Sequence, residues 1–256
     1  MNDAFANIRV LLIQARSDMD MVLQERACFL ERCNLAPHQL ISANVMWTHI
    51  HPGMLAGVDA MFIGGAGEFS ATQNYTWMES LLNLVRRACE CDFPVMGCCW
   101  GHQIIARALG GTVVHDPKKA EMGCHLVRLT EEGCNDPLFQ DYPTAFRVNM
   151  GHHDRISSLP KEAVELAHNV SQPYEAFRIK NKPIYGTQFH SELDSKRERE
   201  RLINYREFYL KELPTDDLFQ QVIDDLADTT EVDRLLLTFL NQFALSKNKV
   251  GKNATM

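Results

Sequence analysis

The stretch FPVMGCCWGHQ (residues 93–103) has the pattern of an apolar strand, a corner and the start of a helix. Gly97 and Gly101 flank Cys99, and two residues without side chains permit a sharp strand-to-helix turn. A cysteine at such a corner lies beside helix N-terminal amides, which can expose the thiol and favour its thiolate form. We therefore predict that Cys99 is a nucleophile and that Cys98 points back toward the sheet. The alternative is that both are small core residues.

Segments typical of strands and helices alternate on both sides of this corner. Strands are expected at residues 8–13, 58–63 and 93–96, and helices at 18–33, 77–91 and 103–109. This alternation is typical of right-handed crossover connections between parallel strands. We predict an α/β fold: a doubly wound, mostly parallel central sheet with helices on both faces.

The second half of the chain carries shorter strand candidates, separated by turn residues. We expect them to form an antiparallel extension of the sheet, with strands at 112–114, 126–129, 146–150, 164–167, 174–179 and 184–189. After Asp194 the chain becomes helical, and its charged run 196–200 is interpreted as a solvent-exposed helix face. We assign residues 5–211 to one domain and 212–256 to a C-terminal helical extension, with helix starts near Pro214 and Thr230.

The composition limits the partners of this protein. Among 256 residues, 33 Asp and Glu outnumber 26 Lys and Arg, giving a formal net charge of −7. An acidic surface disfavours nucleic acid and anionic membranes as partners. A leader sequence and a membrane-length apolar run are not seen, so we expect a cytoplasmic protein. Eight cysteines in such a compartment need no disulfide framework, and Cys89-x-Cys91 lacks a second ligand pair, so no metal site is predicted.

A cysteine nucleophile needs a base, and the segment Gly186-Thr187-Gln188-Phe189-His190-Ser191-Glu192 supplies one. His190 follows an expected strand, where it enters a loop. Glu192 lies two residues further on and can hold one ring nitrogen while the other faces the thiol. His-x-Glu after a strand is weak evidence alone, and its weight comes from the pairing with the Cys99 corner.

At these motifs the chain resembles the class I glutamine amidotransferases, as a stand-alone domain similar to the glutaminase domain of GMP synthetases. Residues 97–103 are similar to the family's Gly-x-Cys-x-Gly-His-Gln signature, and 186–192 to its Gly-x-Gln-Phe-His-x-Glu signature, with Ser191 where proline is usual. Residues 63–67 stand where the family has its oxyanion-loop glycines. Residues 150–154, MGHHD, stand where related domains carry Met-Ser-His-Gly-Asp. The resemblance covers about residues 8–192.

This resemblance implies a catalytic role for each residue of the two main motifs. Cys99 would attack the γ-amide carbon of glutamine or of a γ-glutamyl amide and form a γ-glutamyl thioester. His190 would take the thiol proton and later give it to the leaving nitrogen, and Glu192 would orient His190. The backbone amides of Gly65 and Trp100 would hold the oxyanion.

The resemblance also implies substrate contacts. Gly64, Gln103 and the backbone at Gly151 and His152 are expected to bind the glutamyl group, although Gly151 replaces the family's serine. No cofactor is implied. Segment 121–123 resembles a Glu-x-Gly element of the family and is expected to be structural.

Several functions stay open from the sequence. The chain would act alone on glutamine or γ-glutamyl compounds, or it would be a glutaminase subunit that passes ammonia to a separate synthetase. A non-catalytic regulatory homologue is a third hypothesis, which the presence of all three catalytic residue types argues against. A cysteine peptidase or chaperone-like relative with the same corner is a fourth.

Overall fold

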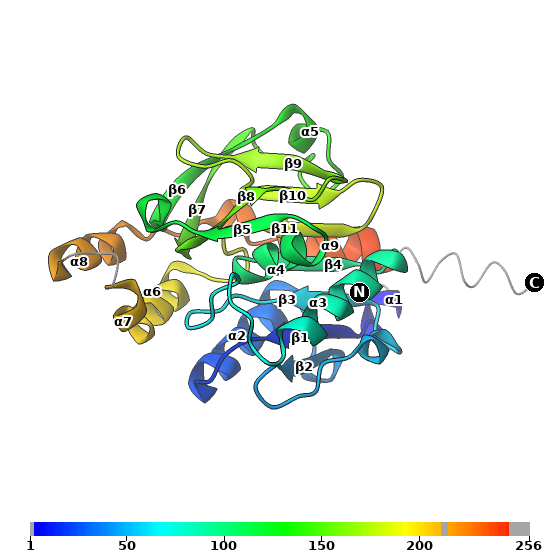
Figure 1. The fold of residues 1–256 in the computed structure, drawn as a ribbon. Coiled ribbons are helices and arrows are strands. Elements are labelled where there is room, and N and C mark those ends of the chain that lie inside the picture. The colour runs from blue at the N-terminus through cyan, green and yellow to red at the C-terminus, as the bar shows by residue number, and fades with distance from the viewer. Residues whose placement is uncertain (1–2, 211–214, 246–256) are drawn as a thin grey trace, which may run out of the picture.

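The computed structural model describes residues 3–210 and 215–245. Its centre is a nine-stranded mixed sheet, flanked by helices (Figure 1). The strand order is β2-β1-β3-β4-β11-β10-β9-β6-β7. The first five strands in this order are mutually parallel: β2 (Leu40–Asn44), β1 (Val10–Gln14), β3 (Ala60–Ile63), β4 (Val95–Cys98) and β11 (Ile184–Thr187). Their carboxyl ends therefore meet at one edge of the sheet, where ligands bind in open α/β sheets.

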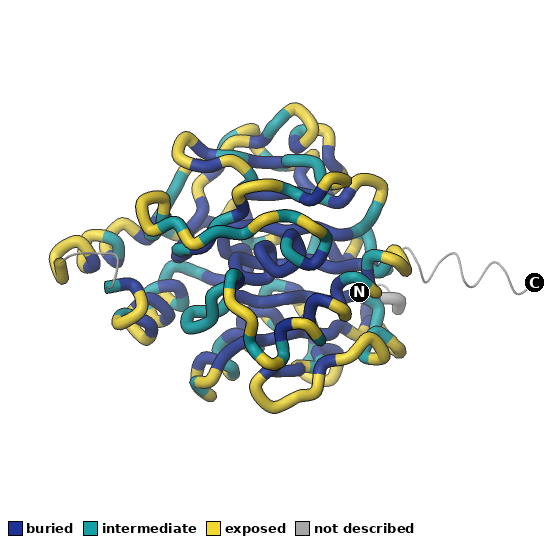
Figure 2. The backbone as a smooth tube through the Cα atoms, viewed as in Figure 1, coloured by how far each residue is buried: buried dark blue, intermediate teal, exposed yellow. Residues whose placement is uncertain are grey.

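Helices cover both faces of this parallel half. Alternate residues of β1 point to opposite faces, and each face has its own apolar core. Leu12 packs in one core with residues of α2 (Met19–Arg32) and α9 (Leu235–Phe239). Leu11 packs in the other with residues of α3 (Met78–Glu90) and α4 (Trp100–Ala108). Figure 2 shows these central strands buried and the connecting loops exposed. The predicted doubly wound α/β fold is confirmed.

The antiparallel extension continues the sheet beyond β11. Its strands are β10 (Ala176–Ile179), β9 (Ala163–His168), β6 (Glu121–Leu129) and β7 (Ala145–His152). One prediction is wrong in detail, because the strand expected at 112–114 leaves the sheet. It forms β5 (Thr112–His115), which pairs with β8 (Asp154–Ser158) in a separate two-stranded antiparallel sheet. The strands β2 and β8 were not predicted.

The described part of the chain after Asp194 is helical, as expected. It contains α6 (Ser195–Asn204), α7 (Arg206–Tyr209), α8 (Asp216–Asp225), α9 and a π-helical turn, η5 (Leu240–Ala244). Thr215 caps α8 by accepting a hydrogen bond from the Leu218 N–H. The remaining short helical segments are α1 (Asp3–Ala6), η1 (Pro37–Gln39), η2 (Pro52–Leu55), η3 (Pro117–Lys119), α5 (Glu131–Cys134) and η4 (Thr230–Val232).

The proposed C-terminal extension is partly built into the core of the main domain. Leu235, Leu236 and Phe239 are completely buried, in the same cluster as Leu12 and Phe62. The expected boundary at 211/212 falls within residues 211–214, and the stretch 246–256 expected to be frayed also lies outside the described residues. Among the helices that are described, none combines the length and apolar character needed to span a bilayer.

The interpretation of the charged run 196–200 as a solvated face is wrong in part. Glu198 is only 2% exposed, and Arg201, one residue beyond the run, only 4%. Both side chains point inward from α6, because this helix packs across the carboxyl edge of the sheet, near the end of β7. Their burial brings two more charges to the site described next.

Candidate active site

Cys99 stands at the corner between β4 and α4, as the sequence predicts. Its backbone has φ 51° and ψ −105°, a left-handed conformation that is strained for a residue with a side chain. The Cys99 N–H donates to the Thr187 carbonyl at 2.8 Å, and the Gly101 N–H donates to the Gly64 carbonyl at 3.1 Å. A Cβ on Gly101 would overlap the Ile63 carbonyl, so the corner needs glycine there. The turn holds the Cys99 side chain at the carboxyl edge of the sheet.

His190 and Glu192 lie together beside this cysteine. The Nδ1 of His190 is 2.7 Å from Oε1 of Glu192. The same oxygen accepts a hydrogen bond from Nη1 of Arg201 at 3.2 Å. A Cβ built on Gly65 would lie 3.1 Å from Cε1 of His190 and 3.9 Å from Cβ of Cys99. These predicted residues, distant in sequence, therefore meet around one point.

The charges of this cluster favour an ionised pair. Burial by itself raises the pKa of Glu192, but His190 and Arg201 outweigh it and lower that pKa to about 2. Burial likewise lowers the pKa of His190, but the negative charges of Glu198, Glu192 and Cys99 raise it well above its ordinary value. These neighbours favour the imidazolium form of His190 beside Cys99.

Two backbone N–H groups flank the sulfur. Trp100 is the first residue of α4, and the N–H groups of a first helical turn have no partner within the helix. Gly65 is the second residue after β3, with its α-carbon beside His190 and Cys99. The backbone hydrogen bonds of residues 3–210 and 215–245 engage neither N–H. Both groups remain available to a carbonyl oxygen bound at Cys99.

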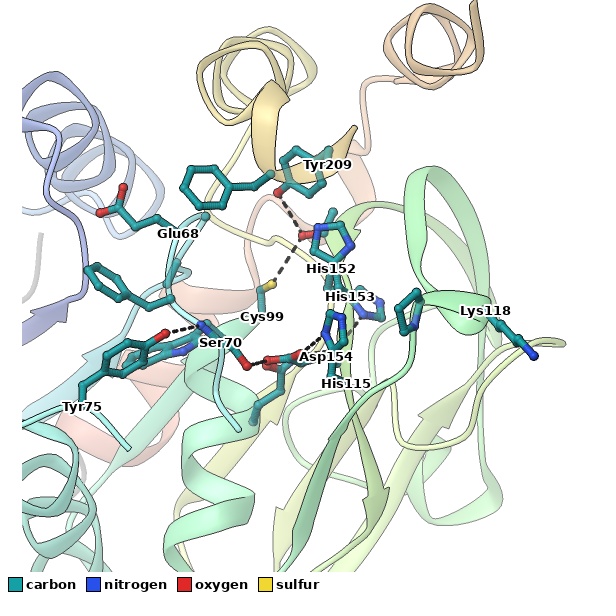
Figure 3. A pocket seen from close by; sticks show the side chains of 18 residues that line it. Glu68, Ser70, Tyr75, Cys99, His115, Lys118, His152, His153, Asp154 and Tyr209 are labelled. Carbon is teal, nitrogen blue, oxygen red and sulfur yellow. Dashed lines mark hydrogen bonds and ion pairs between the residues drawn. The ribbon is translucent and has the colours of Figure 1, made fainter. Parts of the chain in front are cut away.

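A pocket of about 850 Å³ opens in front of the cysteine. Figure 3 shows the Cys99 sulfur between the segment of Ser70 and Tyr75 on one side and His152 on the other. Gln103, Gly151 and His152 all line this pocket, as predicted for substrate contacts. Nδ1 of His152 lies 3.0 Å from the Asp154 carbonyl, and its Nε2 lies 3.3 Å from Oε2 of Glu121. The expected structural role of the Glu121 segment agrees with these contacts, which hold the His152 ring.

Gly64 is placed differently from the other predicted contacts. It is not among the described residues that line the pocket. A Cβ at this position would lie 2.5 Å from Oε1 of Glu25, behind the oxyanion loop. The carbonyl of Gly64 accepts a hydrogen bond from the Gly101 N–H. Gly64 therefore supports the loop and the corner from within the protein.

Among the described residues, Cys98 lines neither of the two cavities that Cys99 lines. It is completely buried, and its Sγ lies 3.9 Å from Oγ of Ser191. Burial raises the pKa of Cys98 well above its ordinary value, so this residue stays a neutral thiol. In the described part of the chain, no group of three or more His, Cys, Asp or Glu side chains is arranged to hold a metal ion.

The structure adds site residues that the sequence prediction did not include. Nε2 of Gln188 lies 3.6 Å from the Cys99 sulfur, and Oε1 of Gln188 accepts a hydrogen bond from Gln103 at 3.0 Å. The hydroxyl of Tyr209 donates to the Gly151 carbonyl at 3.3 Å, above the sulfur in Figure 3. The site residues on α6 and α7 could have been found from helical spacing in the sequence. This spacing puts residues 198, 201, 202, 205 and 209 on one face.

Comparison with known proteins decides the family. The model of the family described as "Glutamine amidotransferase class-I" matches residues 37–209. The chain belongs to the class I glutamine amidotransferases. This class I amidotransferase is 34% identical over 142 residues to one subunit of the GMP synthase of Archaeoglobus fulgidus, covering 54% of the chain and 69% of that protein. It is 36% identical over 104 residues to GMP synthase of Thermosipho africanus, covering 41% of the chain.

The chain spans only 19% of the length of that Thermosipho protein, and 53% of a GMP synthase subunit from Pyrococcus abyssi. A solved glutamine amidotransferase from Thermotoga maritima superposes with a TM-score of 0.67 at 20% identity, covering 93% of this chain and 98% of that one. A second, from Methylobacillus flagellatus, gives a TM-score of 0.66 at 21% identity, covering 93% and 91%. The structures support the fold, and the sequence matches support the family.

Proposed function

We propose that this amidotransferase hydrolyses the γ-amide of glutamine or of a γ-glutamyl amide, acting as a stand-alone protein. The observation that carries the proposal is that Cys99, which lines an 850 Å³ pocket, lies beside His190 and its partner Glu192. A thiolate next to an imidazolium that a buried carboxylate orients is suited to acyl transfer.

In the proposed reaction the Cys99 thiolate attacks the γ-carbonyl carbon, and the electron pair of the C=O bond moves to oxygen. The N–H groups of Gly65 and Trp100 receive this oxyanion, and each such donor is worth about 3–4 kcal/mol of transition-state stabilisation. Nε2 of His190 gives its proton to the nitrogen as the C–N bond breaks, leaving a γ-glutamyl thioester. Water then attacks the thioester and gives a proton to His190, which releases glutamate and restores the ion pair.

A glutaminase subunit is the second candidate, and the relatives favour it. The matched proteins from Archaeoglobus fulgidus and Pyrococcus abyssi are described as subunits of a glutamine-hydrolysing GMP synthase. A similar subunit would deliver its ammonia to a separate synthetase chain. The two candidates share the chemistry at Cys99 and differ in what receives the nitrogen. Purified protein that hydrolyses glutamine at full rate without any partner would favour the stand-alone version.

The test of the shared chemistry compares Cys99→Ala with Cys98→Ala. We expect Cys99→Ala to abolish release of ammonia or amine from a γ-amide, because no other described thiol lies beside His190. Cys98→Ala should retain turnover, since its buried sulfur faces Ser191. Ammonia release is measured by a coupled glutamate dehydrogenase assay, and acyl-enzyme formation by mass spectrometry. Unchanged turnover in Cys99→Ala would refute the mechanism.

A further inference from the structure

A second, much smaller cavity lies on the His190 side of the Cys99 sulfur. Its volume is about 10 Å³, which is room for about one water-sized molecule. Cys99 lines both this cavity and the large pocket, whereas His190 lines only the small one among the described residues. Cys99 therefore lies between the large pocket and a small cavity with room for one small molecule.

The small cavity is lined by a buried carboxylate, one oxygen of which has no hydrogen-bond partner among the described residues. Glu198 lines it and is 2% exposed, and its Oε2 has no hydrogen-bond partner among the described residues. This carboxylate belongs to α6, and its negative charge helps to raise the pKa of His190. When His190 gives up its proton, Glu198 loses that positive neighbour, and a buried charge left without a counter-charge is costly, so a second cation is expected to compensate it.

The two arginines that line the same cavity are already engaged. Arg16 pairs with Glu25 at 2.8 Å and donates to the Tyr205 hydroxyl at 3.0 Å. Arg201 bonds Glu192 at 3.2 Å. Glu25 and Glu192 are bonded to these arginines, so Glu198 is the carboxylate whose positive neighbour, His190, loses its charge during the reaction.

The chemistry brings a nitrogen to this cavity. The leaving nitrogen must reach His190, which protonates it, and His190 faces the small cavity. We propose that Glu198 forms a leaving-group subsite that binds the released nitrogen as ammonium and excludes nitrogen substituents. This inference rests on the function proposed above. The C–N bond electrons leave with nitrogen, and His190 supplies one proton to give ammonia. The water that hydrolyses the thioester returns a proton to His190 and gives its OH to the acyl carbon, and the γ-carboxylic acid so formed ionises and supplies the proton that makes ammonium, which Glu198 binds.

Two tyrosines fix the walls of this subsite. The Tyr209 hydroxyl donates to the Gly151 carbonyl at 3.3 Å, and the Tyr205 ring packs so closely on Gly67 that a Cβ there would overlap it. Both tyrosines are nearly buried. A methyl or larger group on the leaving nitrogen would have to displace one of them. The subsite therefore selects an unsubstituted γ-amide over N-substituted γ-glutamyl amides.

The first experiment compares kcat/KM for glutamine and for γ-glutamyl methylamide, which differ by one methyl group on nitrogen. We expect the wild-type protein to prefer glutamine by about 10- to 200-fold, the usual effect of one extra carbon in a closed site. Equal turnover of both substrates overturns the subsite while the proposed hydrolysis stands. Turnover of neither overturns the proposed function, and the subsite with it.

The second experiment tests Glu198 itself by inhibition with ammonium chloride. Glu198→Gln should weaken this inhibition by about tenfold or more, since a hydrogen bond to a charged group is lost. Glu200→Gln is the matched control, because it removes the same charge two residues away on the exposed side of α6 and should leave inhibition unchanged. Equal inhibition of wild type and a folded Glu198→Gln overturns the proposal.

A measurement on the wild-type protein keeps the proposal testable if Glu198→Gln does not fold. At equal ionic strength, ammonium chloride should inhibit and tetramethylammonium chloride should not, because only the smaller cation fits a cavity of about 10 Å³. Inhibition by both salts, or by neither, contradicts an ammonium subsite.

Discussion

Replacing Glu192 by glutamine removes one negative charge and leaves the shape of the side chain almost unchanged. Oε1 of Glu192 is 2.7 Å from Nδ1 of His190 and 3.2 Å from Nη1 of Arg201, and the residue is completely buried. Glutamine at this position cannot compensate either cation. An imidazolium at His190 then loses its nearest carboxylate, so the fraction of the protein with the reactive ion pair falls.

The size of the effect follows from the distance between the charges. Two unit charges about 4 Å apart at an effective dielectric constant of about 20 interact with about 4 kcal/mol. Since each 1.36 kcal/mol is tenfold in rate, we expect kcat of Glu192→Gln to fall by about 10³-fold. The fold should survive, because Arg201 keeps a hydrogen bond to Gln24 at 2.9 Å and a contact with Glu25 at 3.8 Å.

The assay combines turnover with the rate at which iodoacetamide alkylates Cys99, followed residue by residue by mass spectrometry. Both rates should fall in Glu192→Gln, and Glu200→Gln should match the wild type. Far-UV circular dichroism and the melting temperature report whether each variant is folded. A folded Glu192→Gln that keeps kcat within tenfold of wild type, with unchanged alkylation, would refute the role assigned to this carboxylate.

Two further predictions concern the fold. Gly101→Ala should lower the melting temperature by more than about 8 °C, because its Cβ would overlap the backbone of Ile63, and a shift below about 2 °C in thermal unfolding would contradict the packing. Stability should also fall as the pH drops from about 4.5 to about 2. The pKa of Glu192 and that of Glu121 are each lowered from 4.5 to about 2. Each carboxylate therefore contributes on the order of 3 kcal/mol to the free energy of unfolding, which is fully present above pH 4.5 and is lost as the pH falls to about 2. Urea unfolding at several pH values measures this, and a Glu192→Gln variant with the same acid dependence as wild type would speak against it.

Much of the parallel half was predictable because its signals are local. The apolar run at β1 is buried on both faces and therefore lacks alternation, which is typical of a central parallel strand. Asp18 caps α2 through the N–H groups of Asp20 and Met21, as its sequence position suggested. The corner at Cys99 was predictable because glycine is required on both sides of it.

The unpredicted strands depend on contacts that the sequence does not display. Strand β2 (Leu40–Asn44) lies at the edge of the sheet with Ser42 exposed, so its pattern is short and mixed. Strand β8 has the sequence DRISS, and its pairing with β5 is what makes it a strand.

The inward charges of α6 were missed for a different reason. Glu198 and Arg201 stand in a run of charged residues, which normally faces solvent. Here one face of α6 is turned inward, and Arg201 on that face contacts Glu192 and the buried Glu25. Tertiary contacts between charges thus overrode the local pattern, as happens at functional sites.

The buried charges behind the oxyanion loop have a consequence for exchanging parts between family members. The family match begins at residue 37, yet Arg16 and Glu25 precede it, on the segment after β1 and on α2. Glu25 contacts Arg16 and Arg201, and Arg201 contacts Glu192, so the N-terminal unit and the late helix α6 form one electrostatic chain that ends at His190. A chimera that replaced residues 10–32 would keep Cys99, His190 and Glu192, and it would keep the charge balance around them only if the inserted segment supplied charges equivalent to Arg16 and Glu25. The two ends of the domain are therefore best transplanted together.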